Sequence, residues 1–138
     1  MTVEVRYGGL SPYLTLDPAE PPRPLIAVKL QRGGVSLTTY GLIDSGADSA
    51  LFNSQFAQSL GFTLTPGAGR KTEGIGGEIT EWYFDVYLRV GGKRFLASVG
   101  FSPDWPATFG LLGRDDFFEA FAVGFDQRGQ RVLYHALP

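Results

Sequence analysis

The segment with the clearest potential for chemistry is Asp44-Ser45-Gly46-Ala47-Asp48. Asp44 closes an apolar run, so a buried strand would deliver its carboxylate into a turn. A carboxylate placed there can act as a general acid or base. Ser45 offers a hydroxyl to a neighbouring group, and Gly46 allows close backbone approach. The alternative is that Asp44 only caps a turn or a helix, which is the common role of Asp-Ser-Gly triplets.

Composition excludes several other chemistries. The chain has no cysteine and one histidine, which rules out disulfides, thiolate metal sites, a cysteine nucleophile and a multi-histidine metal site within one chain. A Ser-His-Asp triad that uses His135 finds no Gly-x-Ser-x-Gly elbow, and His135 is most simply a residue of a C-terminal strand. The net charge of −2 offers no basic surface for nucleic acid or an anionic membrane. Carboxylates are the obvious reactive groups.

Length and composition predict one β-rich domain. The 138 residues are 43% apolar and 19% charged, which suffices for a core, and 19 glycines with 9 prolines favour a turn-rich β protein. Residues 1–22 are expected to form an N-terminal extension or linker because of their prolines, and residues 23–138 the domain. The start lacks the apolar run of a signal peptide, and no stretch approaches the roughly 20 residues of a membrane span. We therefore expect a cytoplasmic protein with no membrane partner.

The elements that would position Asp44 are mostly strands. Apolar and polar residues alternate from Trp82 to Val90, which predicts a strand with one buried face, followed by a two-residue turn at 91–92 and a returning strand. Short helices are expected at 53–60, capped by Asn53 or Ser54, and at 115–121. Further strands are predicted at 24–30, 35–44 and 109–113, with a terminal hairpin at 122–137.

Four motifs in order make the sequence similar to a known family. These are Arg23 to Leu30, Leu42 to Asp48, Gly74 to Gly77, and Leu111 to Asp115. They resemble, in turn, the N-terminal strand, the Asp-Thr/Ser-Gly-Ala-Asp motif, the flap tip and the closing apolar-apolar-Gly-Arg-Asp/Asn motif of the retropepsins, single-domain aspartic proteases that include the retroviral enzymes. The resemblance implies an all-β acid-protease barrel with one or two short helices. It also implies a homodimer, since the chain carries one such motif and is too short for two lobes.

The resemblance further implies a mechanism. Each copy would supply one Asp44, and two carboxylates so close hold one proton between them. The ionised Asp44 would take a proton from a bound water, which attacks the peptide carbonyl, while the protonated one hydrogen-bonds the carbonyl oxygen. Ser45 would lock the base of this pair, and Gly46 would bind substrate backbone. No metal or other cofactor is required, and the implied partners are a second copy and an extended polypeptide.

The same resemblance assigns a cleft. The glycine tract at 74–77 would be a hairpin that closes over the substrate; a phosphate loop is excluded because the third glycine of the dinucleotide pattern is missing and the flanks are strands. The alternatives are a surface loop without a ligand for the tract, and plain core packing for the apolar walls. The residues expected to bind substrate are Ala47, Asp48, Gly74, Ile75, Gly76, Phe109 and Leu111.

Two arginines are implied to organise the dimer. Arg114 would pair with Asp48 within a subunit, and Arg23 would reach the acid of the other subunit, although each could instead be a solvated surface charge. The N-terminal extension and the long terminal hairpin depart from the retroviral pattern, so this hairpin is a candidate for building the interface. The interpretation is an aspartic endopeptidase; the alternative is a non-catalytic peptide-binding or dimerisation module with the same fold.

Overall fold

A computed structural model describes residues 1–74 and 77–138 of the chain. Within them strands make up most of the regular secondary structure, with two short helices, which confirms the predicted fold class. The elements in order are β1 (Gly9–Pro12), β2 (Leu25–Arg32), β3 (Val35–Ile43), β4 (Leu51–Asn53), α1 (Ser54–Ser59), β5 (Arg70–Gly74), β6 (Gly77–Val90), β7 (Lys93–Ser102), β8 (Gly110–Leu112), α2 (Phe117–Ala120), β9 (Phe121–Asp126) and β10 (Arg131–Ala136).

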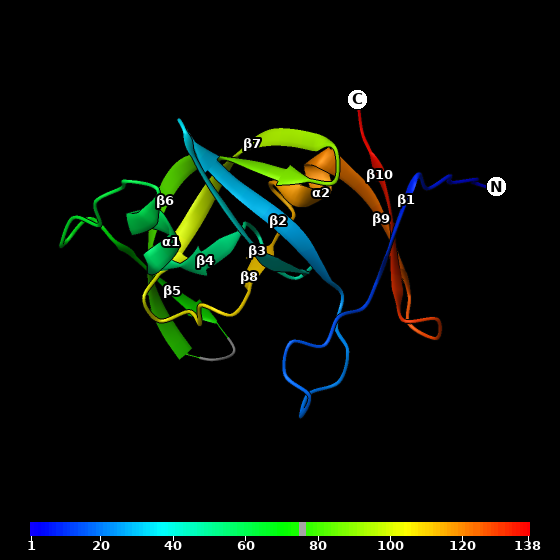
Figure 1. The fold of residues 1–138 in the computed structure, drawn as a ribbon, viewed down its shortest axis with the longest axis horizontal. Helices are drawn as coiled ribbons and strands as arrows, with labels where there is room; N and C mark the ends of the chain where they lie inside the picture. Colours follow the sequence, from blue (N-terminus) through cyan, green and yellow to red (C-terminus); the bar gives the residue numbers. More distant parts are fainter. Residues whose placement is uncertain (75–76) are drawn as a thin grey trace.

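Six strands of a seven-stranded sheet form a closed barrel (Figure 1), and the seventh, β5, is attached to the end of β6 outside it. The strand order in the sheet is β2-β3-β8-β4-β7-β6-β5, and β2 also pairs with β6, which closes the sheet on itself. Closure removes most of the unpaired strand edges, and the inward-facing side chains fill the interior. The largest fully buried side chains of the core are Phe52, Phe101, Phe117, Leu25, Leu30, Leu88 and Leu112.

The position of β8 decides where the Asp44 segment lies. β8 is inserted between β3 and β4 and runs parallel to β3, with Gly41 opposite Gly110 and Ile43 opposite Leu112. Parallel strands end at the same edge of a sheet. The loop 44–50, which connects β3 to β4, therefore passes over the end of β8 and meets the residues that follow it.

The two helices begin and end close to the predicted residues. Asn53 caps α1, because its side-chain oxygen accepts the N–H of Gln55 at 2.9 Å, and Gly61 follows the helix with a φ of +87°. Asp116 caps α2 through the N–H of Phe117. Among the described residues, no helix combines the length and hydropathy that crossing a bilayer requires.

The long hairpin β6–β7 has the predicted register and one buried face. Val86, Leu88 and Val90 are at most 1% exposed, whereas Tyr87 between them is 39% exposed. The turn between the strands contains Gly91 with a φ of +57°, a backbone region in which glycine is favoured. The alternation of apolar and polar residues in the sequence thus predicts correctly which side of β6 faces the core.

The N-terminal strand lies further along the chain than the sequence pattern suggests. Residues 3–7, in which apolar and charged side chains alternate as in a strand, form no strand. β1 instead pairs antiparallel with β10, which pairs with β9 in a separate three-stranded sheet beside the barrel (Figure 1). A Cβ on Gly9 would lie 2.2 Å from a ring carbon of Tyr134, so only glycine allows this close pairing. The division of the chain at residue 22 stays a prediction.

Candidate active site

Asp44 follows the last residue of β3 and is held in a tight turn. Its N–H donates to the carbonyl of Leu112 at 3.0 Å, so the turn begins on the end of β8. Its Oδ1 accepts the N–H of Gly46 at 2.9 Å, and its carbonyl accepts the N–H of Ala47 at 3.2 Å. Asp44 is half-buried, while Ser45 and Gly46 are exposed. The carboxylate therefore has a fixed orientation and remains accessible.

The segment after β8 clamps the rest of this loop. The N–H of Arg114 donates to the carbonyl of Ala47 at 3.0 Å, and the N–H of Asp115 donates to that of Asp48 at 2.8 Å. Gly113 lies against Ser49 so closely that a Cβ on it would be 2.7 Å from the Ser49 nitrogen. Two segments about 65 residues apart in the sequence are thus joined by backbone hydrogen bonds next to Asp44.

Asp116 extends these contacts between the 44–50 loop and residues 112–116, which we call the clamp, in a way that its sequence neighbours do not indicate. Its side chain is buried and accepts three backbone N–H groups, those of Ala50 at 2.5 Å, Gly113 at 3.0 Å and Phe117 at 2.6 Å. Burial raises the pKa of Asp116, while these three N–H groups oppose the rise. The expected helix at 115–121 gives no sign of the contact with Ala50, because a helix cap is a local interaction and Ala50 is distant in the sequence.

The charged residues singled out in the sequence form pairs within the chain. Arg114 and Asp48 form an ion pair, with side chains 56% and 79% exposed. Arg23 pairs with Glu20 at 2.6 Å, and its guanidinium lies 5.7 Å from the centre of the Phe109 ring. The contact of Arg23 with an acid of a second subunit stays a prediction.

The two expected apolar wall residues, Phe109 and Leu111, are half-buried. Leu111 is in β8 opposite Leu42 and Leu51, whereas its neighbour Leu112 is 0% exposed in the core. Phe109 precedes β8, and its carbonyl accepts the indole N–H of Trp105 at 2.7 Å. Leu111 therefore lies in the strand that runs alongside β3 toward Asp44, and Phe109 immediately precedes this strand.

The predicted glycine-rich tip connects β5 to β6. These strands pair from Arg70 opposite Glu81 to Gly74 opposite Gly77. Ile75 and Gly76, which were expected to contact substrate, lie outside the described residues. The structure thus contains the hairpin itself, and the role of its tip stays a prediction.

Comparison with known proteins identifies the fold. No family model and no curated protein matches the sequence. A solved retropepsin-like aspartic protease from Rickettsia conorii superposes with a TM-score of 0.61 and 21% identity, covering 79% of this chain and 87% of that one. EIAV protease complexed with the inhibitor HBY-793 superposes with a TM-score of 0.53 and 22% identity, covering 74% and 89%. The chain therefore has the retropepsin-like fold.

Proposed function

We propose that this chain is an aspartic endopeptidase that works as a homodimer, with Asp44 of each copy at a shared site. The observation that carries the proposal is the position of Asp44. It sits on the retropepsin-like fold at the ends of β3 and β8, in a turn where its Oδ1 accepts the N–H of Gly46. The chain contains one Asp-Ser-Gly triplet, so a pair of such carboxylates requires a second copy.

The chemistry follows from two carboxylates that share one proton. The ionised Asp44 removes a proton from a water molecule, whose oxygen forms a bond to the peptide carbonyl carbon, while the protonated Asp44 hydrogen-bonds the carbonyl oxygen. Breakdown of the resulting tetrahedral species cleaves the C–N bond, and the proton goes to the leaving amine. The clamp formed by 112–116 supports this chemistry because it limits the movement of Asp44.

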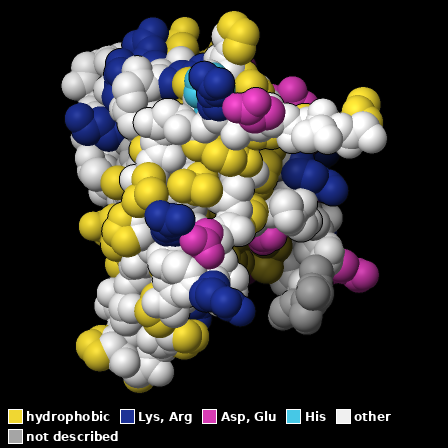
Figure 2. Space-filling model, turned by 90° about the vertical axis from the view of Figure 1, so that its right-hand side faces the viewer, with side chains coloured by type: hydrophobic (Ala, Val, Ile, Leu, Met, Phe, Trp, Pro, Cys, Tyr) yellow, Lys and Arg dark blue, Asp and Glu magenta, His cyan; other side chains and the backbone are white. Residues whose placement is uncertain are grey.

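The face that carries the three-stranded terminal sheet supports association with a second copy. Leu10 in β1 and Phe125 in β9 are 53% and 47% exposed. Figure 2 shows this side of the molecule, where hydrophobic side chains form several groups with charged and other polar side chains between them. Burying such a surface between two copies would contribute favourably to dimer formation.

The proposed substrate is an extended polypeptide with apolar side chains beside the scissile bond. Phe109 and Leu111 would supply the apolar walls, and Ala47 and Asp48 backbone or side-chain contacts. Gly74, Ile75 and Gly76 would cover the bound chain. The pair of Arg114 with Asp48 would hold the rim of the site, where a second copy also lies.

The experiment compares wild type with Asp44→Asn on an unfolded protein substrate from acidic to neutral pH. We expect cleavage by wild type and at least a thousandfold loss in Asp44→Asn, as for removal of a central catalytic group. Asp85→Asn is the matched control, because Asp85 is an exposed carboxylate on β6. Equal cleavage by wild type and Asp44→Asn would remove Asp44 from the mechanism. Binding of the substrate by both proteins without cleavage would favour the non-catalytic module.

A mixing experiment tests the shared site. Excess Asp44→Asn is added to a fixed amount of wild type, and the rate of cleavage is measured after equilibration. If each site needs two copies of Asp44, mixed dimers are inactive and the rate falls as the variant is added. An unchanged rate, with mixed dimers demonstrated by differential labelling, would contradict a site made by two subunits.

A further inference from the structure

The β5–β6 hairpin extends beyond the barrel from a point that can be located in the strand pairing. Trp82 to Val90 of β6 pair with β7, whereas the part of β6 from Gly77 to Glu81 pairs with β5. Glu81 is therefore the residue at which β6 leaves the barrel and becomes one arm of a two-stranded hairpin. A two-stranded hairpin is marginally stable by itself, so its base needs support.

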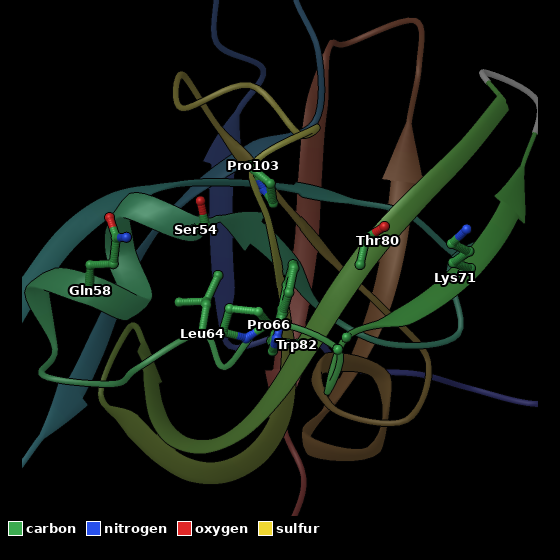
Figure 3. A pocket seen from close by; sticks show the side chains of 10 residues that line it. Ser54, Gln58, Leu64, Pro66, Lys71, Thr80, Trp82 and Pro103 are labelled. Atoms are coloured by element: carbon green, nitrogen blue, oxygen red, sulfur yellow. The ribbon is translucent and has the colours of Figure 1, made fainter.

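The two faces of this hairpin have different surroundings. Lys71, Thr80 and Trp82 share the outer face, where they line a pocket of about 600 Å³ together with α1 and the segment 64–69 (Figure 3). Because side chains alternate along a strand, Glu81 and Tyr83 point to the opposite face. That face is directed toward the end of the Asp44 loop, because a Cβ on Gly100 would lie 3.3 Å from the Tyr83 ring and 3.5 Å from the carbonyl oxygen of Ala50.

Glu81 is a buried carboxylate, 6% exposed, which accepts one hydroxyl group from the hairpin strand β5 and one from the barrel part of β6. It accepts the hydroxyl of Thr72 in β5 at 2.9 Å and the hydroxyl of Tyr83 in β6 at 2.7 Å. None of the ion pairs among the described residues includes Glu81. Hydrogen bonds to a buried charged group are strong and costly to lose, so these two contacts hold the base of the hairpin.

Tyr83 carries the connection from the hairpin to the candidate active site. Its hydroxyl donates to Glu81, and its ring lies against Gly100, where a Cβ would be 3.3 Å away and whose N–H donates to the carbonyl of Ala50 at 2.9 Å. The guanidinium of Arg70, directly opposite Glu81 in the strand register, lies 5.0 Å from the centre of the ring. Burial, followed by the hydrogen bond to Glu81, raises the pKa of Tyr83, so its hydroxyl remains a donor.

We propose that Glu81 is a positioning residue that, through Tyr83 and Gly100, holds the β5–β6 hairpin at a set position relative to the Asp44 loop. The geometry is a series of contacts from Thr72 in the hairpin through Glu81 and Tyr83 to Gly100, whose N–H donates to the carbonyl of Ala50 at the end of the Asp44 loop at 2.9 Å. Only the expected effect on substrate binding, which a correctly held hairpin improves, rests on the proposed function. The structural part of the proposal can be measured without any cleavage.

The structural test is hydrogen exchange of the wild type and Tyr83→Phe, which removes one hydroxyl and keeps the ring. We expect the amides of the paired residues 70–73 and 78–81 to exchange about tenfold faster in Tyr83→Phe, while those of β2 and β3 stay unchanged. Tyr87→Phe is the matched control, since Tyr87 is an exposed tyrosine on the same strand. Unchanged hairpin exchange, or equal acceleration throughout the barrel, would overturn the proposal.

A second variant, Glu81→Gln, tests the acceptor, with Glu78→Gln as control because Glu78 is in an exposed ion pair with Lys71. In peptide cleavage we expect KM to rise about tenfold for Glu81→Gln and Tyr83→Phe, with kcat changed less than about twofold. The double variant should lose little more than either single one, since both break the same contact. A fall in kcat with constant KM, or additive losses, would contradict a positioning role. If wild type cleaves nothing, the proposed function fails while the exchange data still decide the role of Glu81.

Discussion

The carboxylate of Asp116 accepts the backbone N–H of Ala50, a residue 66 positions earlier in the chain. This contact joins the start of α2 to the end of the loop that contains Asp44. The same carboxylate accepts the N–H of Gly113 and of Phe117, so one side chain satisfies three backbone donors in the interior. A carboxylate suits this position because it is a pure acceptor.

Asp116→Ala should therefore destabilise the protein by about 3 kcal/mol, because buried N–H groups lose their acceptor and α2 loses its cap. Urea unfolding followed by fluorescence measures the change. Asp115→Asn is the control, since Asp115 is exposed and next to Asp116, and should change the free energy of unfolding by less than about 0.5 kcal/mol. Equal effects of the two substitutions would contradict the role assigned to Asp116.

The pKa of Asp116 also predicts a pH dependence. Burial raises the pKa of the folded state above 3.8, the ordinary value. As the pH rises past 3.8, the Asp116 carboxyl group loses its proton in the unfolded state before it does so in the folded state. The contribution of Asp116 to stability is therefore present at lower pH and is lost as the pH passes the folded-state pKa. The free energy of unfolding of wild type minus that of Asp116→Asn should fall over this range. A rise would show that the pKa is lowered.

Asp126 should show the opposite sign. Its pKa is lowered by the N–H of Gly129 and by the side chain of Arg131. Its contribution to stability is therefore present above pH 3.8 and is lost as the pH falls through the lower folded-state pKa. The difference between wild type and Asp126→Asn, measured in the same titration, should increase with pH. A flat difference would mean that the contact with Arg131 does not persist in solution.

Gly113→Ala should disturb the Asp44 loop directly. A Cβ at this position would lie 2.7 to 2.8 Å from the backbone atoms of Ser49, and backbone cannot rotate away as a side chain can. We expect a destabilisation of about 2 kcal/mol and a loss of any peptide cleavage larger than the loss of stability explains. Gly34→Ala is the control, because nothing lies within 4 Å of its added Cβ. Full activity of Gly113→Ala would contradict the clamp.

Arg114→Ala separates stability from association. The ion pair with Asp48 is exposed in the single chain, so its loss should change the free energy of unfolding of the monomer by less than about 1 kcal/mol. If this pair lies at the contact between two copies, the dimer dissociation constant should rise about tenfold, with a parallel loss of cleavage. Sedimentation measures the dissociation constant, and the exposed Arg94 of β7 supplies the control Arg94→Ala. An undisturbed dimer would count against this placement.

Much of the barrel could be predicted from local patterns. The alternation from Trp82 to Val90 predicts a half-buried strand, Asn53 and Gly61 mark the ends of α1, and the residues around Asp44 form a recognisable motif. Each of these signals depends on neighbours within a few positions, where propensity, capping and strand period act directly. The terminal strand is a counterexample. The run at 3–7 has strand character but no partner strand, whereas Gly9–Pro12 pairs because Gly9 fits beneath the Tyr134 ring.

By itself the amino-acid sequence determined the strand periods, the caps and the presence of one Asp-Ser-Gly carboxylate, because these depend on residues close together in the chain. Only the tertiary structure decided that β8 lies between β3 and β4, that Asp116 reaches Ala50, and that Glu81 is buried against Tyr83. These relationships join segments whose pairing depends on shape and on unsatisfied backbone groups across the folded chain. The partners of a buried carboxylate such as Asp116 or Glu81 therefore depend on which segments the fold places beside it, and not on its neighbours in the sequence.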